Sequence, residues 1–460
     1  MVALRSRCLE SVFGTPLDTL ASHHIHALVT AGVQEAFDLD YKQTLYGGKD
    51  QEKRALAGDV AALANTGGGV IVLGVEEDDQ ARATKAPGVA ISDVEVARMR
   101  QVIASLVAPM PVVDILTVPE PATDAGEDGI QQGFIVVAVP RSPGTPHAVL
   151  INDGLRFPVR NGATTRYLSE PEIATAYRNR FASAQRQGQR IVEIEREAIS
   201  RLAMDDDYAW VVVSLVPDLP GDMILQNASR DWEMEVRRGR PTVTNEGVGI
   251  NRTRVGRRRL LADGTSNYAA ESRFISLELH TDGSGVFALA VSNLGSRRAT
   301  AQRGGEPDDS GRQVVTDEGI ATGIVSGLLQ LGQHARDRAA AGGTALIRAQ
   351  LHLVAESRPT TIGHTRFYGM GETRTGEQYQ VRADPAEAAA SVDDLAQAGP
   401  GLIEAAALLL DELGHAFGVI EMGQLSRDGR VRRRYWSSSR HPEIVKWAEA
   451  NGIEVTDETL

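Results

Sequence analysis

The sequence predicts an α+β protein of two domains, and three observations support this. Of the 460 residues 42% are hydrophobic and 24% are charged, which is typical of a folded protein with sizeable cores. Both halves of the chain mix period-two strand patterns with helical patterns. A polar helical segment separates the halves. We therefore predict a first domain at 1–182, a helical connector at 183–204, an α+β domain of unknown role at 205–425, and a basic tail with a short helix at 426–460.

The composition also excludes several classes of protein. Cys8 is the single cysteine, so an intrachain disulfide and a cysteine-based zinc site are both excluded. The N-terminus lacks the continuous apolar core of a signal peptide, and no run of 18 uncharged apolar residues occurs, so we expect a soluble cytoplasmic protein. The net charge of −13 argues against a protein that coats DNA non-specifically.

The first domain is expected to begin with short helices within 1–34, followed by a strand in "EAFDLDYK" (35–42). Its apolar residues alternate with Asp38, Asp40 and Lys42, which predicts a half-buried strand. The charged side chains then form either a solvated face or the floor of a site for phosphate chemistry.

An amphipathic helix over 49–65 is expected next, and Asn-Thr-Gly-Gly-Gly (65–69) should end it in a sharp turn. The glycines form either a plain helix-to-strand turn or a loop whose backbone amides cradle phosphate. No Gly-Lys-Ser/Thr follows, so an ATP-binding loop is not predicted. "VIVLGVEEDD" from Val70 should form a buried strand that runs into four acids. A helix at 92–107, two strands and a strand-turn-helix over 156–181 complete the domain.

The second domain should start with the strand "YAWVVVSLVP" (208–217). "FISLELHTDGSGVFALAVSNL" predicts a hairpin with an Asp-Gly-Ser-Gly turn. A long helix, a further strand and a second helix, ended by a glycine near residue 418, should follow.

Four ordered segments of the first domain together resemble the Schlafen AlbA-type (AlbA_2) domain family, which is associated with nucleic-acid binding. They are "EAFDLDYK", "ALANTGGGVIVLGVEED", "FIVVAVPRSPGTPH" and "RFPVRNGATTRYLSEPEI". The resemblance implies a mixed sheet with flanking helices over about two-fifths of the chain. Residues 205–460 resemble no family that we recognise.

The resemblance also implies a site, because some Schlafens act as metal-dependent ribonucleases with three acids. Those positions fall at Glu35, Asp40 and Asp78, which would hold Mg²⁺ or Mn²⁺, while Lys42 would steady the phosphate. This chain departs from the family in two places: Asp40 stands where glutamate is more common, and Gln80 where glycine is more common. The acids of 76–79 also leave the third ligand open.

Several arginines are candidate phosphate contacts. Arg156, Arg160 and Arg166 lie at the end of the fold that the family uses for nucleic acid, or else they pair with the acid cluster. Arg257, Arg258 and Arg259 belong to a dense basic run, which is either a nucleic-acid patch or a solvated loop. The tail arginines 430–434 either grip single strands or dock on an acidic face of the same chain.

The leading functional hypothesis is a divalent-metal-dependent endoribonuclease-like protein, with RNA favoured over DNA, acting in stress or antiphage defence. A non-catalytic DNA-binding regulator and a scaffold subunit of a defence complex are the alternatives. The family's nuclease pairs two related lobes, so a homodimer would supply the second lobe.

Overall fold

The computed structural model describes most of the chain, in two compact units at residues 1–184 and 185–460. The described residues are 7–15, 17–121, 131–152, 154–202, 209–223, 225, 229–244, 246, 249–265, 273–291, 313–352, 360–364, 374–375 and 385–460. None of the helices within these ranges has the length and apolar character that a membrane span needs.

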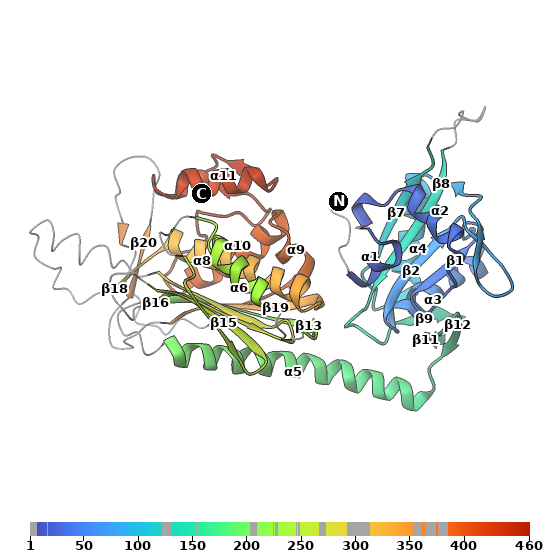
Figure 1. The fold of residues 1–460 in the computed structure, drawn as a ribbon, viewed down its shortest axis with the longest axis horizontal. Coiled ribbons are helices and arrows are strands. Elements are labelled where there is room, and N and C mark those ends of the chain that lie inside the picture. The colour runs from blue at the N-terminus through green and yellow to red at the C-terminus, as the bar shows by residue number, and fades with distance from the viewer. Residues whose placement is uncertain are drawn as a thin grey trace, which may run out of the picture. The chain divides into compact units, whose positions relative to one another are not determined.

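The first unit is built on a five-stranded mixed sheet (Figure 1). Strand β1 runs parallel to β2, whereas β8 pairs antiparallel with β2, β5 and β7. The mixed sheet and flanking helices confirm the predicted fold. The sheet strands are β1 (Leu39–Lys42), β2 (Gly68–Leu73), β5 (Val89–Ala90), β7 (Asp114–Pro119) and β8 (Gln132–Pro140).

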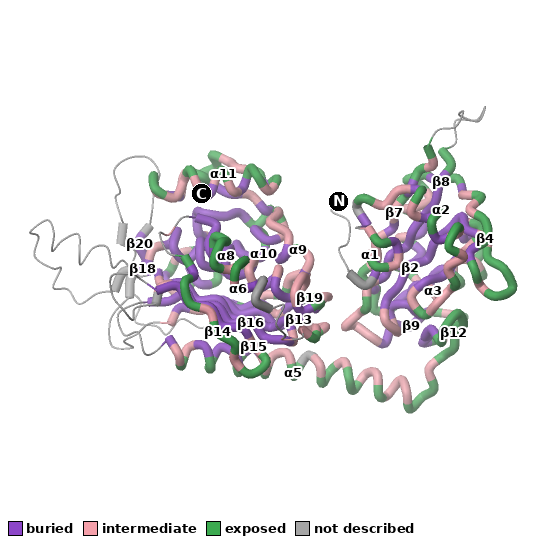
Figure 2. Tube along the Cα trace, viewed as in Figure 1, coloured by how far each residue is buried: buried purple, intermediate pink, exposed green. Residues whose placement is uncertain are grey.

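Helices cover both faces of this sheet, which explains why β2 is apolar at consecutive positions (Figure 2). Ile71 and Leu73 face a core with α3 and α4, whereas Val70 and Val72 face a core with α1 and α2. This split follows from the period of two along a strand. The helices are α1 (Arg7–Phe13), α2 (Ser22–Thr30), α3 (Asp50–Ala64) and α4 (Asp93–Leu106).

Short strands complete the first unit and carry several candidate residues. The hairpin of β3 and β4 follows β2, a three-stranded sheet contains β6, β9 and β10, and β11 pairs with β12. Their bounds are β3 (Glu76–Glu77), β4 (Ala83–Lys85), β6 (Val107–Ala108), β9 (Ala148–Ile151), β10 (Gly154–Arg156), β11 (Pro158–Asn161) and β12 (Thr164–Tyr167). Helix α5 (Glu170–Leu202) follows and continues into the second unit.

The second unit contains a seven-stranded antiparallel sheet in the order β14-β15-β16-β17-β13-β19-β22. In β13, Val211 and Val213 face a core with α8 and α10, whereas Trp210 and Val212 face the C-terminal half of α5. The predicted hairpin is present as β16 and β17. The strands are β13 (Trp210–Leu219), β14 (Arg252–Gly256), β15 (Arg259–Thr265), β16 (Arg273–His280), β17 (Gly285–Ala290), β19 (Gly342–His352) and β22 (Ala386–Ser391).

The remaining elements lie around this sheet and extend to the C-terminus. Trp436 and Ile444 are buried in the same core as α8 and α10, so residues 426–460 pack as part of the second unit. The helices are α6 (Ser229–Arg238), α8 (Asp317–Gln333), α9 (Val392–Ala396), α10 (Pro400–His415) and α11 (His441–Ala450). The smaller strands are β18 (Gln313–Thr316), β20 (Thr360–His364), β21 (Arg374–Thr375), β23 (Val431–Arg432) and β24 (Val455–Thr456).

Candidate nucleic-acid interface

Asp40 of β1 meets a buried arginine and not solvent. Asp40 is only 2% exposed, which corrects the expectation of a solvated acidic face. Arg160 donates from Nη1 to Asp40 Oδ1 at 2.8 Å, and Lys42 Nζ lies 2.5 Å from Asp40 Oδ2. Both carboxylate oxygens therefore already have a cationic partner. A buried carboxylate needs such partners, because an isolated charge in the interior is strongly disfavoured.

Arg160 is fixed from several directions at once. Its backbone N–H donates to Thr66 Oγ1 at 2.9 Å, and Nη2 donates to the carbonyl oxygen of Ala36 at 3.2 Å. The β11 strand thereby joins the end of α3 to the turn before β1. The predicted alternative that arginines pair with the acid cluster describes Arg160, which is only 7% exposed.

Glu35 lies beside this ion pair and has an unusual proton affinity. Its Oε1 accepts a hydrogen bond from the backbone N–H of Tyr41 at 2.6 Å. Burial, together with the nearby carboxylates of Asp40 and Glu77, raises the pKa of Glu35 to about 7 in spite of that hydrogen bond. Glu35 is therefore partly protonated near neutral pH.

Lys42 remains charged in spite of its burial. Burial by itself would lower the pKa of Lys42, but the adjacent Asp40 carboxylate raises it above its ordinary value. Asp59 adds to this effect and accepts a hydrogen bond from the Tyr46 hydroxyl at 2.7 Å. Burial raises the pKa of Asp59 itself. The sequence hypothesis did not include Asp59 and Tyr46, which lie on and before α3.

Asp78 occupies a separate position in the turn between β3 and β4. Its Oδ1 accepts from the backbone N–H groups of Gln80 and Arg82, at 2.8 and 3.0 Å. These hydrogen bonds lower the pKa of Asp78, and its side chain serves its own turn. Among the acids of 76–79, Glu77 acts electrostatically on Glu35 and raises its pKa.

This geometry does not form a ready site for one divalent ion. Asp40 is paired with two cations, Glu35 is partly protonated near neutral pH, and Asp78 accepts hydrogen bonds from its own loop. In the part of the chain that the structure describes, no three His, Cys, Asp or Glu side chains group so as to hold a metal ion. The Mg²⁺ or Mn²⁺ site at Glu35, Asp40 and Asp78 stays a prediction.

The Asn-Thr-Gly-Gly-Gly segment is a helix-to-strand connection that backbone packing requires. Gly69 has φ +155°, and a Cβ there would lie 2.5 Å from the carbonyl oxygen of Asp38. Asn65 accepts from the N–H of His147 at 2.6 Å and donates to the carbonyl oxygens of His147 and Pro158. These contacts favour the plain turn over a phosphate-cradling loop, because they give the glycines and Asn65 a structural role.

The other predicted arginines of the first unit lie at its surface. Arg166 on β12 is exposed but forms a two-bond pair with Glu172, at 2.9 and 3.1 Å. Arg156 on β10 is exposed and lies over the ring of Tyr167, 5.9 Å from its centroid. Arg160 and Arg166 therefore each pair with a carboxylate, whereas Arg156 has no carboxylate partner among the described residues.

Three arginines that the hypothesis omitted add to this surface. Arg141 precedes β9, and Arg178 and Arg180 lie in the first turns of α5. Arg141 and Arg178 are exposed and Arg180 is half-buried, and none of the three pairs with a carboxylate within the described residues. The elements β9, β11, β12 and the start of α5 lie together at one end of this unit (Figure 1).

The basic run of the second unit is ordered as the β14–β15 hairpin. Arg257 is exposed. Arg258 lies in the turn with φ +55° and donates a hydrogen bond to Thr281 Oγ1 at 3.3 Å. Arg259 pairs with Glu197 and, at 3.3 Å, with Glu278. Only Arg257 of this trio therefore presents its charge without a protein partner in the described ranges.

The tail arginines pair with acids of the same unit, which is the second of the two predicted alternatives. Arg432 pairs with Glu421 at 2.7 Å, Arg434 lies 3.5 Å from Asp457, and the adjacent Trp436 is fully buried. Further pairs join Arg430 to Glu458 and Arg433 to Asp457. A stacking platform for single strands is therefore not formed by Trp436.

The fold and the order of these elements agree with a known family. Residues 35–169 match the family model described as Schlafen, AlbA_2. This segment is therefore a Schlafen AlbA_2 domain, as the four ordered segments predicted. The match ends before α5, and the second unit lies outside it.

Two solved structures show weaker similarity. The DIP2311 protein from Corynebacterium diphtheriae is 18% identical with a TM-score of 0.22, and the alignment covers 34% of this chain and only 27% of that protein. The N-terminal domain of a RecG-related protein from Nitrosomonas europaea is 17% identical with a TM-score of 0.22, and the alignment covers 33% of this chain and 96% of that domain. No curated protein matches this chain.

Proposed function

We propose that the first unit binds nucleic acid through phosphate contacts from arginines of the segment 141–184. The AlbA_2 family supports this class of ligand. The observation that carries the proposal is the set of four arginines, Arg141, Arg156, Arg178 and Arg180, that lack a carboxylate partner among the described residues.

The distribution of charge along the unit adds support. Residues 1–140 carry 19 acidic and 10 basic residues, whereas residues 141–184 carry six arginines and three acidic residues. Phosphate contacts supply most of the non-specific affinity for nucleic acid, and an exposed guanidinium binds phosphate with two parallel hydrogen bonds. A basic end on an otherwise acidic unit confines the ligand to that end, because the remaining surface repels it.

Salt-dependent binding tests this proposal directly. Fluorescence anisotropy of the full chain with labelled RNA, single-stranded DNA and duplex DNA should show binding that weakens as salt rises. Arg156→Ala and Arg178→Ala should each weaken binding on all ligands, with the slope against salt lowered by about 1. Lys85→Ala is the matched control, since it removes one positive charge from the acidic β3–β4 hairpin. Equal loss in the control, or no binding at all, would refute the proposal.

The same assay tests the endonuclease predicted from the family resemblance. If labelled RNA is cut with Mn²⁺ present, and EDTA and Asp78→Ala both stop the cutting, the three-acid metal site is supported. Binding without cutting supports the non-catalytic regulator. Comparison of RNA with DNA in these arms also decides between the two ligand classes.

A further inference from the structure

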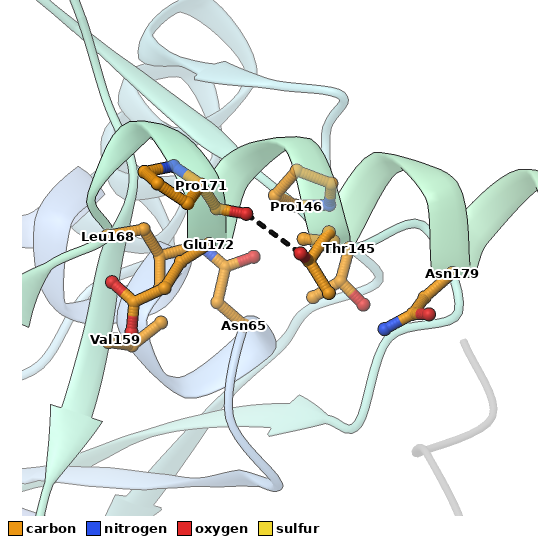
Figure 3. Close-up of a pocket in the computed structure, with 10 residues that line it drawn as sticks. Asn65, Thr145, Pro146, Val159, Leu168, Pro171, Glu172 and Asn179 are labelled. Atoms are coloured by element: carbon orange, nitrogen blue, oxygen red, sulfur yellow. Dashed lines mark hydrogen bonds between the residues drawn. The ribbon is translucent and has the colours of Figure 1, made fainter.

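A cavity of about 430 Å³ lies in the first unit between the β11–β12 hairpin and the start of α5 (Figure 3). Its volume falls within the roughly 300–1,000 Å³ that is usual for small-molecule sites. It is lined by apolar side chains and by several polar ones from four separate segments. The lining residues are Asn65, Thr145, Pro146, Val159, Leu168, Pro171, Glu172, Thr175, Ala176 and Asn179.

Most polar groups of the lining are already used by the protein. Thr145 Oγ1 donates to the carbonyl oxygen of Ser142. Thr175 Oγ1 donates to the carbonyl oxygen of Pro171, which is the dashed line in Figure 3. Glu172 pairs with Arg166 and accepts hydrogen bonds from the backbone N–H and the hydroxyl of Ser169, and these hydrogen bonds lower its pKa to about 2. Glu172 therefore adds an ion pair to the wall and not an unpaired negative charge.

Asn179 differs from these residues. Its side-chain amide has no hydrogen-bond partner in the part of the chain that the structure describes, and it lies at the rim on α5 (Figure 3). A carboxamide offers one acceptor and two donors, which match the hydrogen-bonding edge of a nucleobase. The apolar walls of Pro146, Val159 and Leu168 suit the flat faces of such a ring.

Positive charge is placed beside the same rim. Arg178 and Arg180 flank Asn179 in sequence, and Arg180 is close enough to act electrostatically on His147, the neighbour of Pro146. The loop 142–147 is well fixed, because His147 Nδ1 lies 2.6 Å from the carbonyl oxygen of Pro109 and Nε2 lies 2.7 Å from Ser142 Oγ. A phosphate attached to a base in the cavity would therefore meet arginine at its edge.

We propose that this cavity takes up one unpaired nucleobase of a bound single strand, with Asn179 reading its edge and the flanking arginines holding the adjacent phosphate. This inference rests on the proposed function, since it names the part of the nucleic acid that the first unit recognises. A base within a duplex cannot enter the cavity unless it leaves the stack, which costs free energy. The cavity therefore favours single strands, loops and ends over duplexes.

The test compares single strands with duplexes of the same sequence on the full chain. Ala176→Leu places a larger side chain in the cavity, and Ala182→Leu is its matched control at an exposed position of the same helix. Wild type should prefer the single strand. Ala176→Leu should weaken single-strand binding about fivefold or more, because one base contact is lost. Duplex binding and the melting temperature of the protein should stay unchanged. Asn179→Ala, at an exposed side chain, should give a loss in the same direction.

Each outcome separates this inference from the proposed function. If strand and duplex bind equally and Ala176→Leu binds like wild type, the cavity proposal is refuted while phosphate binding stands. If no nucleic acid binds, the proposed function itself fails. A mixture of nucleoside monophosphates tests whether the cavity binds the base itself. The proposal is supported if the monophosphates compete with the single strand for wild type but not for Ala176→Leu. Binding of monophosphates without any strand binding would overturn it in favour of a free nucleotide.

Discussion

The buried pair of Arg160 and Asp40 gives the sharpest test of the structural interpretation. Both side chains are only 3% exposed, and the two residues join strands that are 120 positions apart in sequence. Arg160→Met keeps most of the side-chain volume but leaves the Asp40 carboxylate with Lys42 alone. Removing one partner of a buried pair costs about 3–5 kcal/mol. We expect the lower end, about 3 kcal/mol, because Lys42 still neutralises part of the charge.

The double variant separates the ion pair from simple loss of packing. Asp40→Asn removes the charge with almost no change in shape, so the buried carboxylate no longer needs a cation. If the pair interacts as described, Asp40→Asn combined with Arg160→Met should be more stable than the sum of the single effects by about 1–3 kcal/mol. Additive effects would mean that the two residues do not interact directly.

The assay uses the uneven placement of the tryptophans. All four, Trp210, Trp232, Trp436 and Trp447, lie in the second unit, so tryptophan fluorescence during urea unfolding follows that unit. Hydrogen exchange of peptides from β1 and β2 follows the first unit. Arg160→Met should accelerate exchange in these peptides and leave the fluorescence midpoint unchanged.

A surface arginine of the same β-hairpin serves as the control. Arg166→Met breaks an exposed pair with Glu172, so it should alter exchange in β1 and β2 far less. The reasoning is refuted if Arg160→Met has no larger effect than this control. Weaker nucleic-acid binding at unchanged stability would instead make Arg160 a phosphate contact.

Three further expectations follow from the same structure. Glu35 has a pKa of about 7 in the fold against an ordinary value of 4.5, so the stability that it contributes is present below pH 4.5 and is lost as pH rises to 7. Glu35→Gln should therefore be more stable than wild type above pH 7 by about 1–2 kcal/mol after allowance for solvent screening, with no difference below pH 4.5 in urea titrations. Gly69→Ala should cost about 2–3 kcal/mol, because its Cβ would meet the Asp38 carbonyl oxygen, whereas Gly58→Ala, in open space within α3, should stabilise by about 0.5–1 kcal/mol by thermal unfolding. Arg440→Met should destabilise the second unit by about 3–5 kcal/mol in tryptophan fluorescence, because it leaves two partly or fully buried glutamates without their cation.

Local patterns predicted much of the fold. The apolar run "WVVVSL" and the β16–β17 hairpin form strands whose successive side chains lie on opposite faces of the sheet, as period two requires. The glycine turn after α3 was also predicted, because glycine is the residue that tolerates the positive φ of Gly68 and Gly69. These features depend on neighbours in sequence.

The features that sequence patterns did not predict depend on long-range contacts. Alternation alone put Asp40 on a polar face, but only the fold brings Arg160 over that face and buries it. A row of four acids offers no local reason to choose among them. The turn hydrogen bonds engage Asp78, whereas Glu77 acts electrostatically on Glu35. The family resemblance gave the domain correctly, since an ordered set of motifs carries more information than any one spacing.

The paired and unpaired arginines of 141–184 together predict the salt dependence of binding. Arg160 is neutralised inside and Arg166 at the surface, which leaves Arg141, Arg156, Arg178 and Arg180 without carboxylates among the described residues. If each contacts one phosphate of a single strand, the slope of log K against log salt should be about −3, from about 0.7 per phosphate. A slope near zero would contradict phosphate binding by this surface. A slope steeper than about −5 would require further cations, of which the exposed Arg257 in the second unit is the first to test by substitution with alanine.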